Sequence, residues 1–274
     1  MLEDRFSVSE RRACRAIGQS RSTQRREPPA PPDEEQVLRT RLCVLARAHP
    51  RYGYRRMTTI LRREGFCVNH KRIQRLCRDE GLRVVRKPKK RSRVGVSTIN
   101  GARLRATRPN QVWALDFQFD QTSDLRTLKI LNITDEFTKE ALTIDIRRSI
   151  KADDVVEVLD ILVARRGCAP QFLRMDNGPE LTANTLRDWC RFSLAGTAYI
   201  EPGSPWENPF VESFNGKLRD ELLAMEVFET LAEARVLAEE FRTEYNTFRP
   251  HSALGMRTPA EFAKMWTDNQ PGLT

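Results

Sequence analysis

Long apolar runs are absent from the sequence. No stretch of its 274 residues approaches ~18 consecutive apolar side chains, the length that a membrane-spanning helix needs. The N-terminal segment carries charges but no apolar stretch after them, which argues against a secretory signal. We therefore expect a cytoplasmic protein without a membrane partner.

Closely spaced metal-binding cysteines and histidines are absent as well. No two cysteines are separated by two residues, and the three histidines lie far apart in the sequence. Because a structural zinc site needs such spacing, we expect no zinc site. The thiols are better interpreted as reduced and mostly buried. The six cysteines are Cys14, Cys43, Cys67, Cys77, Cys168 and Cys190.

Acidic residues are scarce in the first hundred positions. Residues 1–100 hold 26 Lys or Arg and 10 Asp or Glu, a balance of +16, whereas residues 101–274 hold 21 and 27, a balance of −6. A basic half joined to an acidic half indicates a polyanion-binding region beside a separate functional module. The alternative is a basic surface that serves only solubility.

The first 35 residues predict a small helical segment and a stiff linker. Residues 7–26 are typical of one or two short helices, with Ser9 as a cap and Gly18 as an end. Four prolines in the five residues 28–32 then break the pattern.

Residues 36–83 predict three helices. The first covers residues 36–48, the second residues 53–64, and the third begins at Asn69 and ends at Gly81. The short connection between the last two is typical of a helix-turn-helix.

The third predicted helix is amphipathic. Its apolar residues lie at helical spacing on one side, and its cations lie on the other, where a recognition helix meets DNA. The alternative is an ordinary three-helix bundle with a charged exterior. Residues 86–93 follow with six Lys or Arg, which indicates nonspecific phosphate binding. The inward residues are Ile73, Leu76 and Cys77, and the outward cations are Lys71, Arg75 and Arg78.

The hydrophobic pattern changes at Gln111, where segments typical of β-strands begin. Three strands in series indicate an antiparallel meander, and a helix, a strand, a helix, a strand and a final helix over residues 205–225 follow. The order β-β-β-α-β-α-β-α predicts an α/β fold with a mixed sheet of five strands.

Three acidic residues stand where a structural role is hard to find. Asp116 lies inside an apolar strand, Asp176 follows a strand directly before Asn-Gly, and Glu212 lies between apolar residues of the last helix. Buried carboxylates are costly unless they are paired or bound to metal. Mg²⁺ or Mn²⁺ suits an all-carboxylate site, and two such ions can support phosphoryl transfer.

Each of these carboxylates also has an ordinary interpretation. Asp176 alone fits a turn residue, and Glu212 alone fits a solvent-facing position of an amphipathic helix. Other carboxylates lie at strand ends, turns or helix starts, and they compete for the same assignment: Asp120, Asp135, Glu180 and Glu207.

Five segments together resemble a known family, the OrfB-type transposases of the insertion-sequence-three family, relatives of retroviral integrases. The 35 residues between Asp176 and Glu212 are the spacing typical of this family. The similarity covers nearly the whole chain. The segments are HPRYGYRRMTTILRREG, RPNQVWALDF, RMDNGPE, SPWENPFVESFNGKLRDE and EYNTFRPHSALGMRTPAEF.

The resemblance implies an RNase H-like catalytic core in which Asp116, Asp176 and Glu212 hold two Mg²⁺ or Mn²⁺ ions. It implies strand cleavage at the element ends and attack by the freed 3′-OH. The implied partners are double-stranded DNA (terminal inverted repeats and target DNA), further copies of the chain on DNA, and an upstream OrfA product. The implied setting is the bacterial nucleoid. Two alternatives stay open: a metal-dependent nuclease with the same core, and a noncatalytic DNA-binding regulator.

Arg219 follows Glu212 by seven residues and therefore shares its helix face, as do Asn208 and Asn215. A cation there can hold a DNA phosphate, although an ion pair with Asp220 is an alternative. The full set of expected DNA contacts is Arg219, Lys217, Asn208, Asn215, Lys71, Arg72, Arg75, Arg78, Lys87, Lys89 and Lys90.

The expected domains are a helical segment with its linker (1–35), a helix-turn-helix region with a basic tail (36–93), a linker (94–108), the catalytic core (109–226) and a C-terminal helical extension (227–274).

Overall fold

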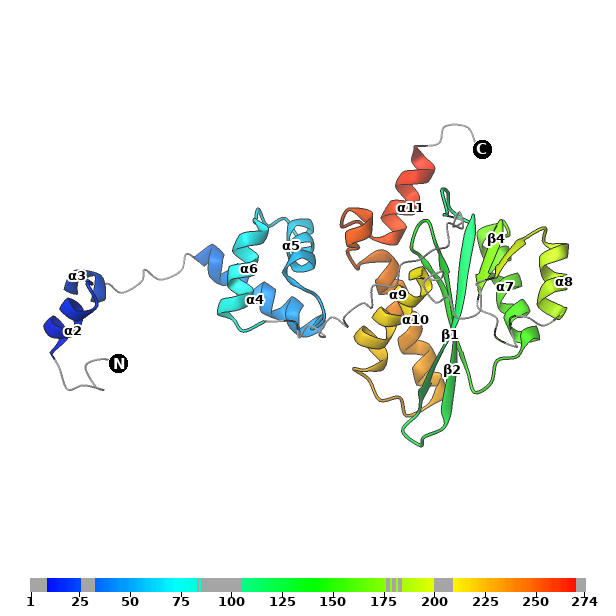
Figure 1. The fold of residues 1–274 in the computed structure, drawn as a ribbon, viewed down its shortest axis with the longest axis horizontal. Coiled ribbons are helices and arrows are strands. Elements are labelled where there is room, and N and C mark those ends of the chain that lie inside the picture. Colours follow the sequence, from blue (N-terminus) through cyan, green and yellow to red (C-terminus); the bar gives the residue numbers. More distant parts are fainter. Residues whose placement is uncertain are drawn as a thin grey trace, which may run out of the picture. The chain divides into compact units, whose positions relative to one another are not determined.

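The computed structural model describes residues 9–25, 33–82, 84, 105–175, 178, 181, 184–199 and 209–269 (Figure 1). The chain divides into two compact units, residues 1–44 and residues 45–274. Within the described ranges, no helix is both long and apolar enough to cross a membrane.

The first unit contains the two short helices that the sequence predicts. Helix α2 spans Glu10–Ala16 and α3 spans Arg21–Gln24. Ser9 occupies the N-cap position of α2, but its side chain makes no cap hydrogen bond. Gly18 adopts φ 69° directly after α2, which confirms the predicted end of that helix. Helix α4, Asp33–Ala48, begins three residues before its predicted start, and it carries three acidic side chains in its first turn.

Helices α5, Tyr54–Arg63, and α6, His70–Asp79, form the predicted helix-turn-helix pair. The Asn69 side chain caps α6 by accepting a hydrogen bond from the Lys71 backbone amide. Gly81 has φ 68° and follows the end of α6, as predicted. The predicted inward residues Ile73, Leu76 and Cys77 are buried, and the predicted outward cations Lys71, Arg75 and Arg78 are exposed.

A mixed five-stranded sheet forms the centre of the second unit, in the order β3-β2-β1-β4-β5. The long strands β1, Val112–Gln121, and β2, Thr127–Asp135, pair antiparallel, and β3, Ala141–Arg147, extends this meander. The short strands β4, Phe172–Met175, and β5, Gly196–Tyr199, pair parallel on the other side of β1. The element order and mixed sheet agree with the prediction.

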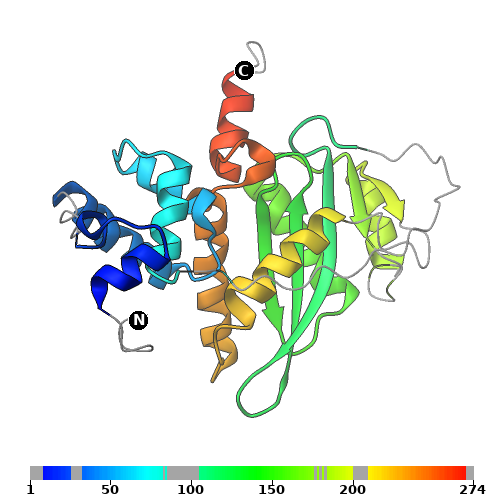
Figure 2. The ribbon, with the colours of Figure 1, turned by 60° about the vertical axis from the view of Figure 1, so that its left-hand side comes forward.

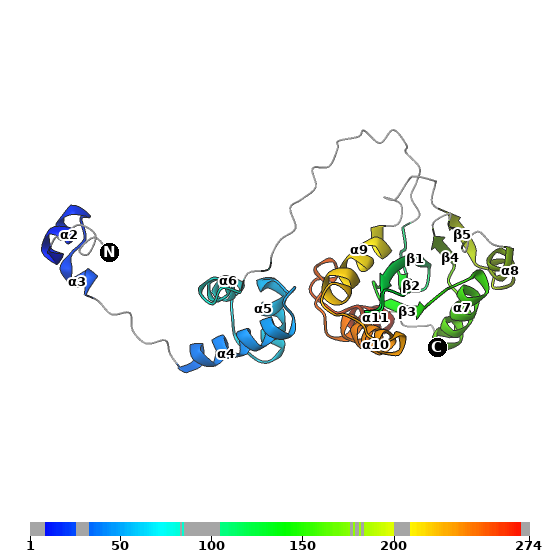
Figure 3. The same ribbon diagram turned by 90° about the horizontal axis from the view of Figure 1, so that it is seen from below.

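Helices cover both faces of this sheet (Figure 3). On one face, α7, Ala152–Arg166, and α8, Asn184–Phe192, enclose an apolar cluster that contains Trp113 and Leu115 of β1. On the other face, α9, Pro209–Leu218, and α10, Leu231–Thr247, enclose a second cluster that contains Leu128 and Ile130 of β2. Successive strand residues point to opposite faces, so β1 contributes its odd-numbered apolar side chains to the cluster on the α7 face.

The last predicted helix is interrupted, which corrects the sequence prediction. The apolar spacing predicted one continuous helix through Met225, but α9 ends at Leu218 and a turn of π-helix, η2, spans Arg219–Leu223. The wider turn buries both Leu222 and Leu223. After α10, a short 3₁₀ turn, η3, spans Ser252–Leu254, and α11 spans Pro259–Asp268.

The pairing of β4 with β5 makes a stability prediction. A Cβ atom added at Gly196 would lie 2.6 Å from Cδ1 of Phe172, its partner in the sheet. Gly196→Ala should therefore lower the free energy of unfolding by about 1–3 kcal/mol, as overpacked sites do. Chemical denaturation measures the change.

Gly216 in α9 provides the matched control, because a Cβ there meets no atom within 4 Å. Gly216→Ala should raise stability by about 0.5–1 kcal/mol through helix propensity. Equal effects of the two substitutions would contradict the close approach at Gly196.

Candidate catalytic site

Asp116 lies in the middle of β1, on the sheet face that α9 covers. The odd-numbered residues Trp113 and Leu115 of the same strand belong to the cluster on the α7 face. Because side chains alternate along a strand, the even-numbered Asp116 points toward the α9 face. The side chain is half-buried, and its Oδ1 accepts a hydrogen bond from the Phe117 backbone amide at 2.9 Å.

A network of neutral amides holds Asp116 to α9. Asn215 donates from Nδ2 to Oδ2 of Asp116 at 2.7 Å, and its own Oδ1 accepts from Asn132 at 2.8 Å. Gln118 of β1 donates to the backbone carbonyl of Asn215 at 3.2 Å, and Asn132 donates to Gln118 at 3.2 Å. Asn132 is the cross-strand partner of Asp116 in the β1–β2 register. Helix α9 is thus fixed across two strands (Figure 2).

Glu212 precedes Asn215 by three residues on α9. Residues at this spacing lie on the same side of a helix, so the contact between Asn215 and Asp116 also brings the Glu212 side of α9 toward β1. The Glu212 side chain is exposed. The surrounding protein still removes some water from its carboxyl group, and this desolvation raises the pKa of Glu212 above the ordinary value.

Asp176 lies outside the described residues, and so do Asn208, Lys87, Lys89 and Lys90. Strand β4 ends at Met175, and it runs parallel to β1 with Arg174 opposite Ala114. Within the described ranges, no group of three or more His, Cys, Asp or Glu side chains is arranged to hold a metal ion.

A buried ion pair, which the sequence pattern did not predict, lies just before the end of β4. Arg174 Nη1 donates to Glu136 Oε1 at 2.5 Å, and the two side chains are 5% and 0% exposed. Gln118 and Asn132 were also missed. The available signal was a polar residue within a buried strand, which is the pattern that identified Asp116.

Asp135, one of the competing carboxylates, has a structural role. Its oxygens accept hydrogen bonds from the backbone amides of Asn110, Phe137 and Thr138, at 2.6 to 2.8 Å. It is buried, and burial raises the pKa of its carboxyl group. Asp120 accepts from the backbone amide of Gln121 at 2.8 Å.

The two cations predicted on α9 and η2 lie in different surroundings. Arg219 is exposed, and its Nη2 donates to the backbone carbonyl of Phe119 on β1 at 3.2 Å. Lys217 instead donates to the Ser213 carbonyl and hydroxyl of its own helix, at 3.0 and 2.8 Å. Burial, followed by the nearby Arg249, lowers the pKa of Lys217 to about 8. Arg219 therefore lies beside β1, whereas Lys217 lies near Arg249 and Glu221.

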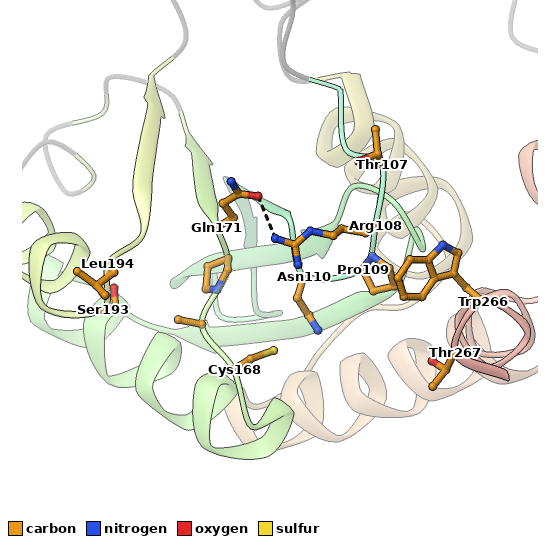
Figure 4. A pocket seen from close by; sticks show the side chains of 12 residues that line it. Thr107, Arg108, Pro109, Asn110, Cys168, Gln171, Ser193, Leu194, Trp266 and Thr267 are labelled. Atoms are coloured by element: carbon orange, nitrogen blue, oxygen red, sulfur yellow. Dashed lines mark hydrogen bonds between the residues drawn. The ribbon is translucent and has the colours of Figure 1, made fainter. Parts of the chain in front are cut away.

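A pocket of about 820 Å³ lies at the start of β1 and β4 and contains neither Asp116 nor Glu212 (Figure 4). Two of its lining residues are joined by a hydrogen bond, which Arg108 Nη2 donates to Gln171 Oε1 at 3.2 Å. Because Asp116 lies further along β1, the pocket is separate from the carboxylates. Its lining residues are Thr107, Arg108, Pro109, Asn110, Cys168, Ala169, Pro170, Gln171, Ser193, Leu194, Trp266 and Thr267.

The chain matches two kinds of domain family. Residues 33–90 match the HTH-like domain, and residues 106–205 and 195–259 match integrase core domains. The sequence is 42% identical over 263 residues to the insertion element IS407 uncharacterized 31.7 kDa protein of Burkholderia multivorans, which covers 96% of this chain and 93% of that protein.

Two further similarities extend this result. The sequence is 32% identical over 246 residues to the transposase InsD for insertion element IS2A/D/F/H/I/K of Escherichia coli, with 81% of this chain and 78% of that protein covered. A chain of the simian T-cell lymphotropic virus intasome in complex with the PP2A regulatory subunit B56 gamma shares the fold. Its TM-score is 0.51 at 16% identity, over 62% of this chain and 58% of that chain.

The sequence relatives, the helix-turn-helix pair and the mixed sheet agree with one another. The chain therefore belongs to the insertion-sequence-three family of transposases, with an HTH-like domain before an integrase core of RNase H-like fold.

Proposed function

We propose that the chain is a DNA transposase that cuts one strand at each end of its element and joins the freed 3′-OH to target DNA. It would act as a metal-dependent polynucleotidyl transferase whose ligands are Asp116, Asp176 and Glu212. The observation that carries the proposal is the 2.7 Å hydrogen bond from Asn215 to Asp116. This bond places the helix that bears Glu212 against the strand that bears Asp116.

The register of β4 supports Asp176 as the second carboxylate. Arg174 lies opposite Ala114 in a parallel pair, and β4 ends one residue later at Met175. Asp176 is the next residue in the sequence after β4, and β4 lies beside the strand that carries Asp116.

Mg²⁺ or Mn²⁺ suits these residues because both ions prefer carboxylate oxygens. Asn215 and the Phe117 amide, which both donate to Asp116, are neutral, so these contacts leave its negative charge for a cation. Two ions held there would stabilise charge on the attacking and leaving oxygens of the phosphodiester. The protein's own contribution is to fix the direction of the Asp116 oxygens through Asn215.

Binding to DNA would come from separate basic surfaces. Helix α6 exposes Lys71, Arg75 and Arg78 on one side, where a recognition helix contacts a duplex. Exposed Arg219, beside β1, would hold a phosphate near the carboxylates. We further propose that several copies assemble on paired element ends.

The first prediction concerns the three carboxylates. Asp116→Asn, Asp176→Asn and Glu212→Gln should each abolish cleavage and joining, because they remove a metal-binding charge while keeping the side-chain shape. Labelled oligonucleotides that carry an element end, incubated with Mg²⁺, measure both steps, and fluorescence anisotropy measures DNA binding, which should persist.

Asp120→Asn on the same strand is the matched control and should retain activity. Normal joining by any one of the three variants would remove that residue from the site. A wild-type protein that cuts but never joins would be a nuclease, and one that only binds would be a regulator.

A second prediction tests the amide network. Asn215→Ala removes the donor to Asp116, a hydrogen bond to a charged group worth about 1.5–3 kcal/mol. The joining rate at saturating DNA should fall roughly ten- to a hundredfold.

Asn246→Ala is the control, because Asn246 also ties a helix to the sheet, through two 2.9 Å hydrogen bonds to the Ala141 backbone. It should lower the melting temperature without slowing the folded enzyme. If the two variants slow joining equally, Asn215 has no special role at Asp116.

A third prediction concerns α6. Replacing Lys71, Arg75 and Arg78 together by Ala should weaken DNA binding and reduce the slope of log affinity against log salt. The slope should fall by about 0.9 for each phosphate that the variant no longer binds. Anisotropy titrations between roughly 50 and 200 mM salt measure the slope. Arg187→Ala, which removes an exposed cation of α8, is the control. An unchanged slope for the triple variant would place the DNA surface elsewhere.

A further inference from the structure

Two segments that are distant in the sequence lie together in the folded chain. The proposed chemistry uses neither of them. The first is HPRYGYRR, residues 49–56, which leads into α5, and the second runs from the end of α10 through residue 257. Tyr52 donates from its hydroxyl to Glu244 at 3.0 Å, and His49 Nδ1 lies 3.2 Å from the same carboxylate. Arg56 donates to the Pro250 carbonyl at 3.3 Å.

Arg249 lies at the centre of this junction and is 2% exposed. Its guanidinium lies 5.7 Å from the ring centre of Tyr52 and 5.6 Å from that of Tyr245. It donates to both carboxylate oxygens of Glu221, at 2.8 and 2.5 Å. The Glu221 side chain is 12% exposed, so this is a largely buried, bidentate ion pair.

Glu221 belongs to η2, the π-helical turn that directly follows α9. Arg51 also reaches this turn, where its Nε donates to the Asp220 carbonyl at 3.2 Å. The turn is therefore held through a side chain by Arg249 and through the backbone by Arg51. Glu221 follows Glu212 by nine positions, a length of about 13 Å along a helix. Helix α9 is therefore fixed near Asp116 by Asn215 and beyond its C-terminal end by Arg249.

We propose that Arg51, Tyr52 and Arg249 are positioning residues for Glu212. Tyr52 covers one face of Arg249, Arg249 holds η2 through Glu221, and the turn sets the direction of α9 and its exposed carboxylate. Segment 49–56 then belongs to the catalytic unit, although its last three residues are the start of α5 in the helix-turn-helix pair. The catalytic part of this inference rests on the proposed transposase activity.

The burial of Tyr52 supports this assignment over a role in reading DNA. Tyr52 is 4% exposed, its ring contacts Arg249, and its hydroxyl is bound to Glu244. A side chain with its face and its polar atom both occupied in this way is not available to a base or a phosphate.

Hydrogen exchange of the full-length chain, without DNA or metal, tests the physical part. In Tyr52→Ala, amides of residues 209–223 should exchange about tenfold faster than in the wild type, because η2 loses support. Tyr52→Phe keeps the ring and should restore slow exchange. Tyr54→Ala is the matched control, because the ring of Tyr54 stacks on His70 of α6, at 6.5 Å between centroids. It should leave α9 unchanged.

The functional part is measured with element-end DNA. Tyr52→Ala should lower the joining rate at saturating DNA by about tenfold while the Kd changes by less than about threefold. A raised Kd with a normal saturated rate would overturn the proposal and make the segment a DNA-binding element. Unchanged exchange in α9 would overturn it as well.

Arg51→Met provides a second variant in case Tyr52→Ala does not fold. Arg51 is half-buried, and the substitution removes its hydrogen bond to the Asp220 carbonyl. Exchange in residues 209–223 should accelerate, and unchanged exchange would overturn the proposal. A wild-type chain without joining activity would instead refute the proposed function, while the exchange result would still decide whether the junction holds α9.

Discussion

The hydrogen bond between Asn215 and Asp116 is the contact on which the proposed site depends. A carboxylate in the middle of a sheet needs donors, but a cationic donor would neutralise the charge that a metal ion requires. The amide of Asn215 meets both demands, since it satisfies one oxygen and leaves the negative charge in place. Asn132 and Gln118 hold Asn215 in turn, so the same network that orients Asp116 also locks α9 across β1 and β2.

Asp135, on the neighbouring strand β2, has different hydrogen-bond donors from Asp116. Three backbone amides saturate it, and it closes a turn at the end of β2. Asp116 instead accepts from a side-chain amide and a backbone amide, and it remains half-exposed on the face of α9. The mixed sheet places parallel β4 directly beside β1, so the strand that precedes Asp176 ends next to the strand that carries Asp116. The donors of Asp135 tie it into the backbone of a turn, whereas Asn215 ties Asp116 to the helix that carries Glu212.

The sequence predicted elements that depend on local chemistry and missed those that depend on distant contacts. Asn69 and Gly81 bound α6 as expected, because caps and left-handed turns are specified by single residues. Asp116 was chosen as a candidate because an acid inside an apolar strand seldom has a purely structural role, and its position in the middle of β1 agrees with the predicted strand. The π-helical turn at residues 219–223 was missed because its apolar spacing also fits an α-helix, and Glu221 finds Arg249 only in the folded chain. Lys217 and Arg219 were both expected to contact DNA, and in the structure their side chains donate to different acceptors, Ser213 and Phe119.

The ion pair between Arg249 and Glu221 extends this argument from α9 to the rest of the second unit. Burying a guanidinium and a carboxylate together contributes little net stability, because desolvation offsets much of their attraction. What such a pair does provide is direction, since two parallel hydrogen bonds admit one orientation of the turn against the end of α10. Tyr52 and Tyr245, which are 193 positions apart in the sequence, both lie beside this guanidinium. The neutral amide network and the buried ion pair thus have different roles. The amides of the network contact Asp116 without adding a charge, whereas the ion pair uses opposite charges to hold the turn that follows α9.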